Sequence, residues 1–221
     1  MTMNRTILAV SLLCAALIVP AAALAGPTPE ETIRSIVDSV VAVLTDEALD
    51  GDAKVGKLEG QLDTCCMFET TSKLVLARSW KTFTPEQQTE FVDLFKRYLI
   101  ATYGKNVDVY AGETVAITGG REETRGDYTV QTRVDRGGGD KDLLVDYRLR
   151  KNEDGLWRII DVIGEGISLV ANLRSQLQEV MSSGGAEKVL DTLRKKAAEN
   201  DEATNAKEAY IPAALAVAMF Q

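Results

Sequence analysis

The sequence predicts an α+β fold in a single domain: a four-stranded, curved antiparallel sheet that helices cover on one face. Three observations support this prediction. Apolar residues recur every three or four positions through much of residues 28–103, as in amphipathic helices. From Val115 onward, apolar and polar residues alternate, as in half-buried strands. Glycine-containing connectors separate the alternating segments, as in β-hairpins.

The first 25 residues have the pattern of a Sec-type signal peptide. Arg5 is followed by the apolar run Ile7 to Val19, and Ala23-Leu24-Ala25 supplies small residues at the expected cleavage site. An uncleaved membrane anchor is the alternative, but the run is short for a membrane span. We therefore expect an exported protein with residues 1–25 as signal peptide, residues 26–198 as one domain and residues 199–221 as a C-terminal tail.

The composition excludes several classes of function. The chain has 33 acidic and 25 basic residues, a formal net charge of −8, and signal-peptide removal takes away one further positive charge. An acidic chain is a poor candidate for binding nucleic acid or for adhering directly to an anionic bilayer. The sequence contains no histidine, which removes Ser-His and Cys-His nucleophile pairs and most zinc sites. We expect no cofactor and no metal.

Two adjacent cysteines, Cys65 and Cys66, remain after removal of residues 1–25. Adjacent cysteines rarely form a disulfide with each other, because a trans peptide holds the two side chains poorly for the required geometry. We interpret them as two small side chains buried on a helix. A metal site or a redox couple would need more ligands than this chain supplies.

Two of the expected helices begin with strong start signals. Thr28-Pro29-Glu30-Glu31 combines an N-cap threonine, an early proline and a glutamate three residues after the cap, and Thr84-Pro85-Glu86-Gln87 repeats the arrangement. The helix that begins at Thr28 should end near Thr45. The helix that begins at Thr84 should run to Tyr103, with Gly104 as its C-cap. Residues 46–64 show a weak helical pattern, and Met67 to Trp80 is predicted to be helical.

The strands are predicted from alternation. The apolar members are, in order along the chain, Val115 and Ile117; Tyr128, Val130 and Val134; Leu143, Val145, Tyr147 and Leu149; and the run Trp157 to Ile163. Short glycine- or asparagine-containing connectors predict an antiparallel meander with one apolar face.

A glycine hinge should follow the last strand. Gly164 and Gly166 allow a sharp turn into a helix that folds back over the sheet, with Ile167, Val170, Leu173, Leu177 and Val180 on one stripe. After a break at Gly184-Gly185, Ala186 to Ala198 is the last regular helix. The apolar run Tyr210 to Phe220 in the tail is too short to cross a membrane.

Several motifs resemble one known family. They are LVLARSW (74–80), TPEQQ (84–88), FVDLFKRYL (91–99), VDYRLRK (145–151) and WRIIDVIGEGISLV (157–170). Together they are similar to the toluene-tolerance/MlaC family over roughly Ile33 to Ala198. RGDYTVQTR (125–133) is also similar to a sister branch associated with hopanoids.

This resemblance implies a cystatin-like or nuclear-transport-factor-like fold that encloses a deep apolar pocket. It also implies a periplasmic phospholipid carrier, the soluble auxiliary component of an ABC transport system that maintains outer-membrane lipid asymmetry. Its partners would be an inner-membrane ABC transporter/MCE protein complex and an outer-membrane lipoprotein complex. A hopanoid or another lipid is the alternative ligand.

We expect the lipid-binding side chains to come from the long helix, the sheet and the closing helix. They are Phe95, Tyr98, Leu99, Tyr128, Val130, Tyr147, Leu149, Ile167, Val170 and Leu173. For any one of them, plain core packing is the alternative interpretation. Arg78, Arg97 and Arg174 are candidate head-group partners, or else solvated surface cations.

We do not expect an enzyme. Asp161 and Glu165 form a pair of carboxylates, but their positions suit capping of the hinge and of the helix N-terminus. The alternative is an isomerase-like enzyme, with Tyr128 or Tyr147 and Asp161 in one small closed pocket. An adaptor without a ligand would instead have a collapsed interior.

Overall fold

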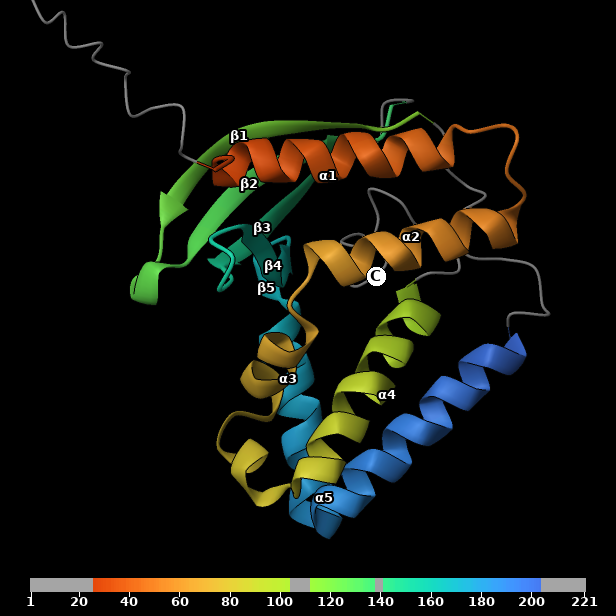
Figure 1. Cartoon of the computed structure of the whole chain (residues 1–221), viewed down its shortest axis with the longest axis vertical. Helices are drawn as coiled ribbons and strands as arrows, with labels where there is room; N and C mark the ends of the chain where they lie inside the picture. The colour runs from red at the N-terminus through yellow and green to blue at the C-terminus, as the bar shows by residue number, and fades with distance from the viewer. Residues whose placement is uncertain (1–25, 104–111, 138–140, 204–221) are drawn as a thin grey trace, which may run out of the picture.

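The structure is a computed structural model that describes residues 26–103, 112–137 and 141–203 (Figure 1). The element order is α1 (Pro29–Leu44), α2 (Gly51–Cys65), α3 (Phe68–Leu76), η2 (Ala77–Thr82), α4 (Pro85–Tyr103), β1 (Thr114–Glu122), η4 (Thr124–Gly126), β2 (Tyr128–Asp135), β3 (Leu143–Lys151), β4 (Trp157–Gly164), β5 (Ile167–Ser168) and α5 (Leu169–Ala203). In Figure 1, α1 and the sheet form an upper layer, and α3, α4 and α5 form a lower lobe. Helix α2 lies between them.

The sheet confirms the predicted α+β fold class with one addition. Its strands follow the chain order β1-β2-β3-β4-β5, and every neighbouring pair is antiparallel. The fifth strand, which was not predicted, has only two residues and pairs Ile163 with Ser168 and Gly164 with Ile167. A two-residue strand is too short to show alternation, which is why the sequence predicted four strands.

One face of the sheet packs on α1. Side chains of β2, β3 and β4 on this face form a buried cluster with one side chain of α1; its members are Ile33, Val130, Val134, Val145, Leu149, Ile159 and Val162. The predicted start of α1 is confirmed. Thr28 Oγ1 accepts from Glu31 N at 3.1 Å, and the Glu31 carboxylate accepts from Thr28 N at 2.8 Å.

A tyrosine ties the sheet to the beginning of α1. The Tyr128 hydroxyl donates to the Glu30 carboxylate at 2.6 Å, and the tyrosine ring lies over Gly120 of β1. A Cβ atom on Gly120 would lie 2.6 Å from the Tyr128 ring and 2.8 Å from the Glu30 carboxylate. The ring therefore occupies the space that a side chain at position 120 would need.

We accordingly expect Gly120→Ala to destabilise the protein by about 1–3 kcal/mol, because the added methyl group must displace the Tyr128 ring. Chemical denaturation monitored by circular dichroism measures this change. The control is Gly56→Ala, which adds a methyl group at an exposed helical position with no atom within 4 Å of the new Cβ and should not destabilise the protein. The explanation is wrong if Tyr128→Ala, which removes the ring and its hydroxyl, leaves the destabilisation caused by Gly120→Ala unchanged.

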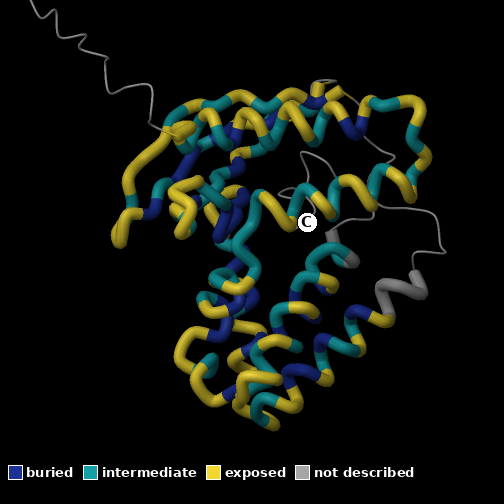
Figure 2. Tube along the Cα trace, viewed as in Figure 1, coloured by how far each residue is buried: buried dark blue, intermediate teal, exposed yellow. Residues whose placement is uncertain are grey.

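A second core lies in the lower lobe, where α3, α4 and α5 pack on each other. Phe91 and Phe95 of α4 are fully buried and stack with ring centroids 5.6 Å apart. Val75, Leu173 and Leu190 are among the residues that surround them. Figure 2 shows the buried residues concentrated in the sheet and in this lobe. The predicted start of α4 is confirmed, since Thr84 and Gln87 cap each other reciprocally.

Helix α5 is one element with a sharp kink. The predicted break is confirmed: Gly185 has a φ of 68°, a region that favours glycine, and the chain turns there (Figure 1). The returning half of α5 is bound to α4 through Arg194, which lies 2.6 Å from the Glu90 carboxylate. No helix within the described residues is both long and apolar enough to span a membrane.

Three details differ from the sequence predictions. Ile167 belongs to β5 and is 51% exposed, so placing it on the helical stripe was wrong; α5 begins two residues later. The helix after Met67 ends at Leu76 and continues as the 3₁₀ segment η2, because Ala77 adopts a φ of 50°. The cysteines are half-buried at the end of α2 instead of buried. The predictions for residues 1–25, Gly104 and Tyr210 to Phe220 fall outside the described residues.

Candidate functional site

A cavity of about 330 Å³ lies between α1, α2 and the sheet. The apolar side chains that line it are Ile33, Ile36, Val37, Val40, Val41 and Leu44 of α1; Val55, Leu58 and Leu62 of α2; Val115, Ile159, Ile160 and Val162 of the sheet; and Phe68, Leu99, Ile100, Leu169 and Val170 of α3, α4 and α5. The ends of α4 and α5 thus close the cavity against the lower lobe. Its volume is within the usual range for small-molecule sites, about 300–1,000 Å³.

Helix α2 covers this cavity without being part of either core. It has no buried residue, and in Figure 2 its trace carries only intermediate and exposed positions. Its N-terminus is capped by Asp50, whose carboxylate accepts from Ala53 N at 2.8 Å. Gln61 Nε2 donates to Ser39 Oγ at 2.8 Å and so joins α2 to α1. Near the end of α2, Thr64 O accepts from Arg158 Nε of β4 at 2.9 Å, so polar contacts join this cover to α1 and to the sheet.

The polar groups in the cavity wall are mainly uncharged or acidic. They include the hydroxyl of Tyr147, the thiols of Cys65 and Cys66, and the carboxylate of Asp161. No lysine or arginine is among the described residues that line the cavity. Burial raises the pKa of Tyr147 to about 12, with a smaller contribution from Cys65, so the phenol stays neutral at physiological pH.

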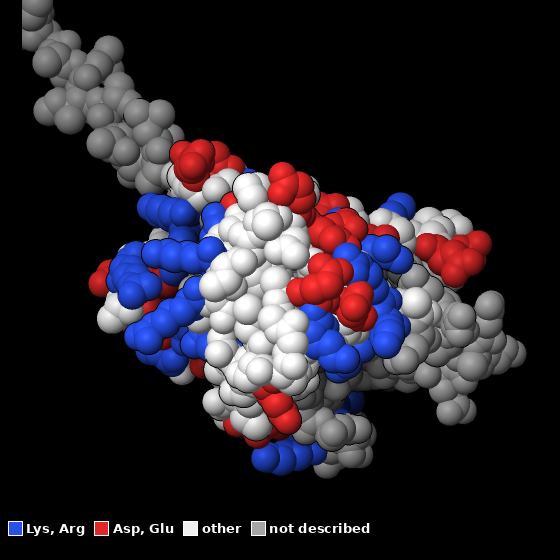
Figure 3. Space-filling view, turned by 90° about the horizontal axis from the view of Figure 1, so that it is seen from below, with Lys and Arg blue, Asp and Glu red and all other residues white. Residues whose placement is uncertain are grey.

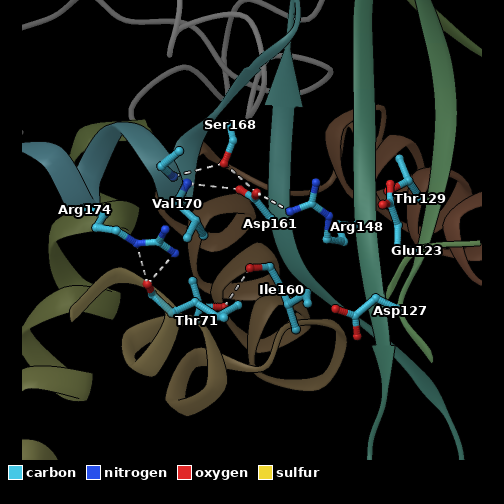
Figure 4. Close-up of polar contacts among 12 residues, drawn as sticks. Thr71, Glu123, Asp127, Thr129, Arg148, Ile160, Asp161, Ser168, Val170 and Arg174 are labelled. Atoms are coloured by element: carbon cyan, nitrogen blue, oxygen red, sulfur yellow. Dashed lines mark hydrogen bonds and ion pairs between the residues drawn. The ribbon is translucent and has the colours of Figure 1, made fainter. Parts of the chain in front are cut away.

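Asp161 organises the junction between β4 and α5 (Figure 4). One carboxylate oxygen accepts from Val170 N at 3.0 Å, and the other accepts from the Ser168 hydroxyl at 2.6 Å and lies 3.4 Å from Arg148 Nη1. Ser168 Oγ in turn accepts from Ala171 N at 3.0 Å. These contacts satisfy two backbone N–H groups in the first turn of α5, which confirms the capping role predicted for Asp161.

Burial raises the pKa of the Asp161 carboxyl, although its hydrogen bonds act in the opposite direction.

Glu165 has a different structural role from Asp161. Its carboxylate accepts from Leu144 N at 2.8 Å and its own N–H donates to Leu144 O, so it fastens the turn after β4 to β3. Among the described residues, no group of three or more histidine, cysteine, aspartate or glutamate side chains is placed to hold a metal ion.

The cavity brings together three of the ten predicted lipid contacts: Leu99, Tyr147 and Val170. The others lie elsewhere. Phe95, Tyr98 and Leu173 belong to the core of the lower lobe. Val130 and Leu149 belong to the core under α1, and Tyr128 packs against that core under α1. Ile167 is exposed at the sheet edge. Their contact with a lipid stays a prediction.

The three arginines predicted to meet a head group do not line the cavity. Arg78 is exposed on η2, and Arg97 is exposed on α4. Arg174 is half-buried and donates through Nε and Nη2 to Leu74 O, at 2.9 and 2.7 Å, which ties α5 to the end of α3 (Figure 4). A head-group role for these residues likewise stays a prediction.

Most of the cavity wall comes from α1 and α2, which the sequence reasoning did not include. A signal existed in α2: Val55, Leu58 and Leu62 recur at helical spacing in an otherwise polar segment. A narrow apolar stripe on a polar helix indicates a helix that covers a surface without entering a core. For α1 no such signal existed, because its apolar stripe is equally suited to packing on a sheet.

A family model described as MlaC protein matches residues 34–195, which include nearly all of the residues that line the cavity. The chain belongs to the MlaC family. Among solved structures, this MlaC-family chain is similar to a phospholipid-binding protein from Ralstonia solanacearum, determined in complex with a phospholipid. The two share 27% sequence identity with a TM-score of 0.68, and the match covers 77% of this chain and 97% of the other.

Proposed function

We propose that this chain is a periplasmic carrier that binds phospholipid and shuttles it between inner- and outer-membrane complexes as the soluble component of an ABC transport system. The single observation that carries the proposal is the cavity beneath α2, whose wall is mostly apolar and whose charged members are the acidic residues Glu59, Glu113 and Asp161. Membership of the MlaC family and the similarity to a protein that binds phospholipid support it.

The energetics of an acyl chain explain why such a carrier needs membrane partners. Each methylene group buried from water contributes about 0.8 kcal/mol, so two acyl chains of ordinary length contribute on the order of 20 kcal/mol before ordering costs. Spontaneous release into water is then negligible. Lipid must be received and delivered while the carrier is docked on a membrane complex, which we propose to be an ABC transporter/MCE complex at one membrane and a lipoprotein complex at the other.

The surface charge favours docking on proteins over direct adhesion to an anionic bilayer. The chain has a formal net charge of −8. Figure 3 shows basic side chains gathered on one side of an uncharged strip, on the face seen from below, and acidic and basic side chains mixed on the other side. A surface that carries both signs of charge provides complementary contacts for a specific protein partner, and the net negative charge opposes adhesion to an anionic bilayer.

The hydrogen bonds of the candidate catalytic groups favour a carrier over an enzyme. The Asp161 carboxylate accepts from Val170 N and from the Ser168 hydroxyl and pairs with Arg148, which is the environment of a structural cap more than of a general base. The Tyr128 hydroxyl is bound to Glu30 outside the cavity. Tyr147 and Asp161 both line the cavity, but among the described residues no hydrogen bond joins them, and the Asp161 carboxylate binds the junction between β4 and α5 instead.

The test is to purify the protein from a bacterial periplasm, extract it with organic solvent and identify the extract by mass spectrometry. We expect phospholipid in a fixed ratio to protein. A hopanoid in that ratio would replace phospholipid as the ligand. No lipid in the extract, together with no uptake from vesicles that carry the partner complex, would contradict the carrier function.

A further inference from the structure

Cys65 and Cys66 form a pair of thiols in the wall of the cavity that the proposed carrier function does not use. Both are free, half-buried and part of the cavity lining. Their Sγ atoms lie 3.6 Å apart and share a hydrogen bond. We propose that this pair is a redox modification site: an external disulfide converts it reversibly into a Cys65–Cys66 disulfide, and the change moves the end of α2.

The two thiols differ in the way that thiol–disulfide exchange requires. The hydrogen bond from Cys66 lowers the pKa of Cys65, whereas the same bond and burial raise the pKa of Cys66. Cys65 is therefore the attacking thiolate. It bonds to one sulfur of the oxidant RSSR and releases RS⁻; Cys66 then loses its proton, attacks Cys65 Sγ and releases the second RS⁻. Two protein thiols are oxidised, and one external disulfide is reduced by two electrons.

Ring closure must change the backbone. Consecutive Cα atoms are about 3.8 Å apart across a trans peptide, which is shorter than the roughly 4.4–6.8 Å usual in disulfides. The two Sγ atoms must also approach from 3.6 Å to about 2.05 Å. The new bond therefore alters the dihedral angles of both cysteines. Disulfides formed under such constraint are the more easily reduced ones, which makes the modification reversible.

The backbone that must change is the point where α2 is attached to the sheet. Cys66 N donates to Leu62 O and closes the last turn of α2, and Met67 N donates to Ile159 O of β4 at 3.0 Å. Cys66 and Ile159 also form an isolated parallel bridge. Because α2 has no buried residue to anchor it, a change at this attachment is transmitted to the cover of the cavity.

The test uses the full chain, reduced and then treated with oxidised glutathione, with iodoacetamide added before trypsin. Lys57 and Lys73 flank one peptide, residues 58–73, that contains both cysteines and no other tryptic site. We expect this peptide without iodoacetamide adducts and lighter by the two thiol hydrogens. Alkylation of both cysteines, or glutathione retained on either, would overturn the proposal. In Cys66→Ser, which has no resolving thiol, Cys65 should instead retain glutathione.

The effect on the cavity is tested separately and rests on the proposed carrier function. Reduced and oxidised chains are loaded from phosphatidylethanolamine–phosphatidylglycerol vesicles, and we expect severalfold different uptake. The Cys65→Ser/Cys66→Ser double variant should take up equal amounts with and without oxidant. Equal uptake by the two forms of the wild-type chain would overturn the coupling to α2. No uptake by either form would contradict the carrier function, while the peptide result would still report on the disulfide.

Discussion

Replacement of Leu58 by aspartate is expected to abolish lipid carriage while the fold is retained. Leu58 is half-buried on α2 and lines the cavity. An aspartate there places a carboxylate against the acyl chain, and desolvating a charge costs several kcal/mol. Because about 1.4 kcal/mol corresponds to a tenfold change in binding, phospholipid recovered per protein should fall by at least about tenfold. Quantitative mass spectrometry of the organic extract measures the loss.

The matched control is Gly56→Asp, two residues earlier on the same helix. Gly56 is exposed, lies outside the cavity lining, and has open space around the position of a Cβ atom. The variant carries the same added charge, but on the solvent side of α2, so it should recover as much lipid as the wild type. Circular dichroism of both variants should show native helix content, since α2 has no buried residue. Equal lipid recovery from Leu58→Asp and Gly56→Asp would contradict the cavity assignment.

The second large effect is expected from Asp161→Ala, which removes the cap that joins β4 to α5. The Ser168 hydroxyl, Val170 N and Arg148 would lose a common acceptor in a site where Asp161 is only 4% exposed. Removing one partner of a buried polar network costs about 3 kcal/mol. For a domain of this size that corresponds to a decrease in Tm of roughly 6–12 °C. Calorimetry or thermal circular dichroism gives the value.

Two further variants distinguish the effect of losing the buried hydrogen-bond network from the effect of losing a charge alone. Glu69→Ala removes an exposed carboxylate paired with exposed Lys73 and should leave the Tm nearly unchanged, because exposed ion pairs contribute little. Asp161→Asn keeps an acceptor for Val170 N and should be less destabilised than Asp161→Ala. A decrease in Tm that is the same for Glu69→Ala and Asp161→Ala would show that the cap has no special role.

The raised pKa of Asp161 adds a pH dependence with a definite sign. Burial raises the pKa of the Asp161 carboxyl in the folded protein above its value of about 3.9 in the unfolded chain. The folded protein therefore holds the Asp161 proton more tightly, and the stability that this proton contributes is fully present below about pH 3.9. That stability is lost as the pH rises from about 3.9 through the folded pKa of Asp161. Asp161→Asn does not titrate, so the stability difference between wild type and this variant should narrow over that interval.

Local structure followed directly from particular residues. The reciprocal caps of Thr28 with Glu31 and of Thr84 with Gln87 formed as predicted, because a cap involves only residues within one helical turn. The alternation in β2 and β3 predicted their inner faces, because the side-chain period of a strand is a local property. The break at Gly185 followed from the backbone freedom of glycine. The sequence motifs also indicated the MlaC family, which the family model confirms.

The division between core and cavity could be settled only by the tertiary structure. Phe95 and Leu99 occupy one face of α4, four residues apart, yet Phe95 is fully buried among aromatic rings and Leu99 lines the cavity. Likewise, Leu149 and Tyr147 share the inner face of β3, but Leu149 is fully buried in the core under α1 whereas Tyr147 lines the cavity. Nothing local to either pair distinguishes its members. What decides is the place of α2, which long-range contacts set: Gln61 with Ser39, and Met67 N with Ile159 O. The sequence alone predicted most of the side chains that face inward, because periodicity is a local property, whereas the position of one covering helix decided whether they meet protein or a cavity.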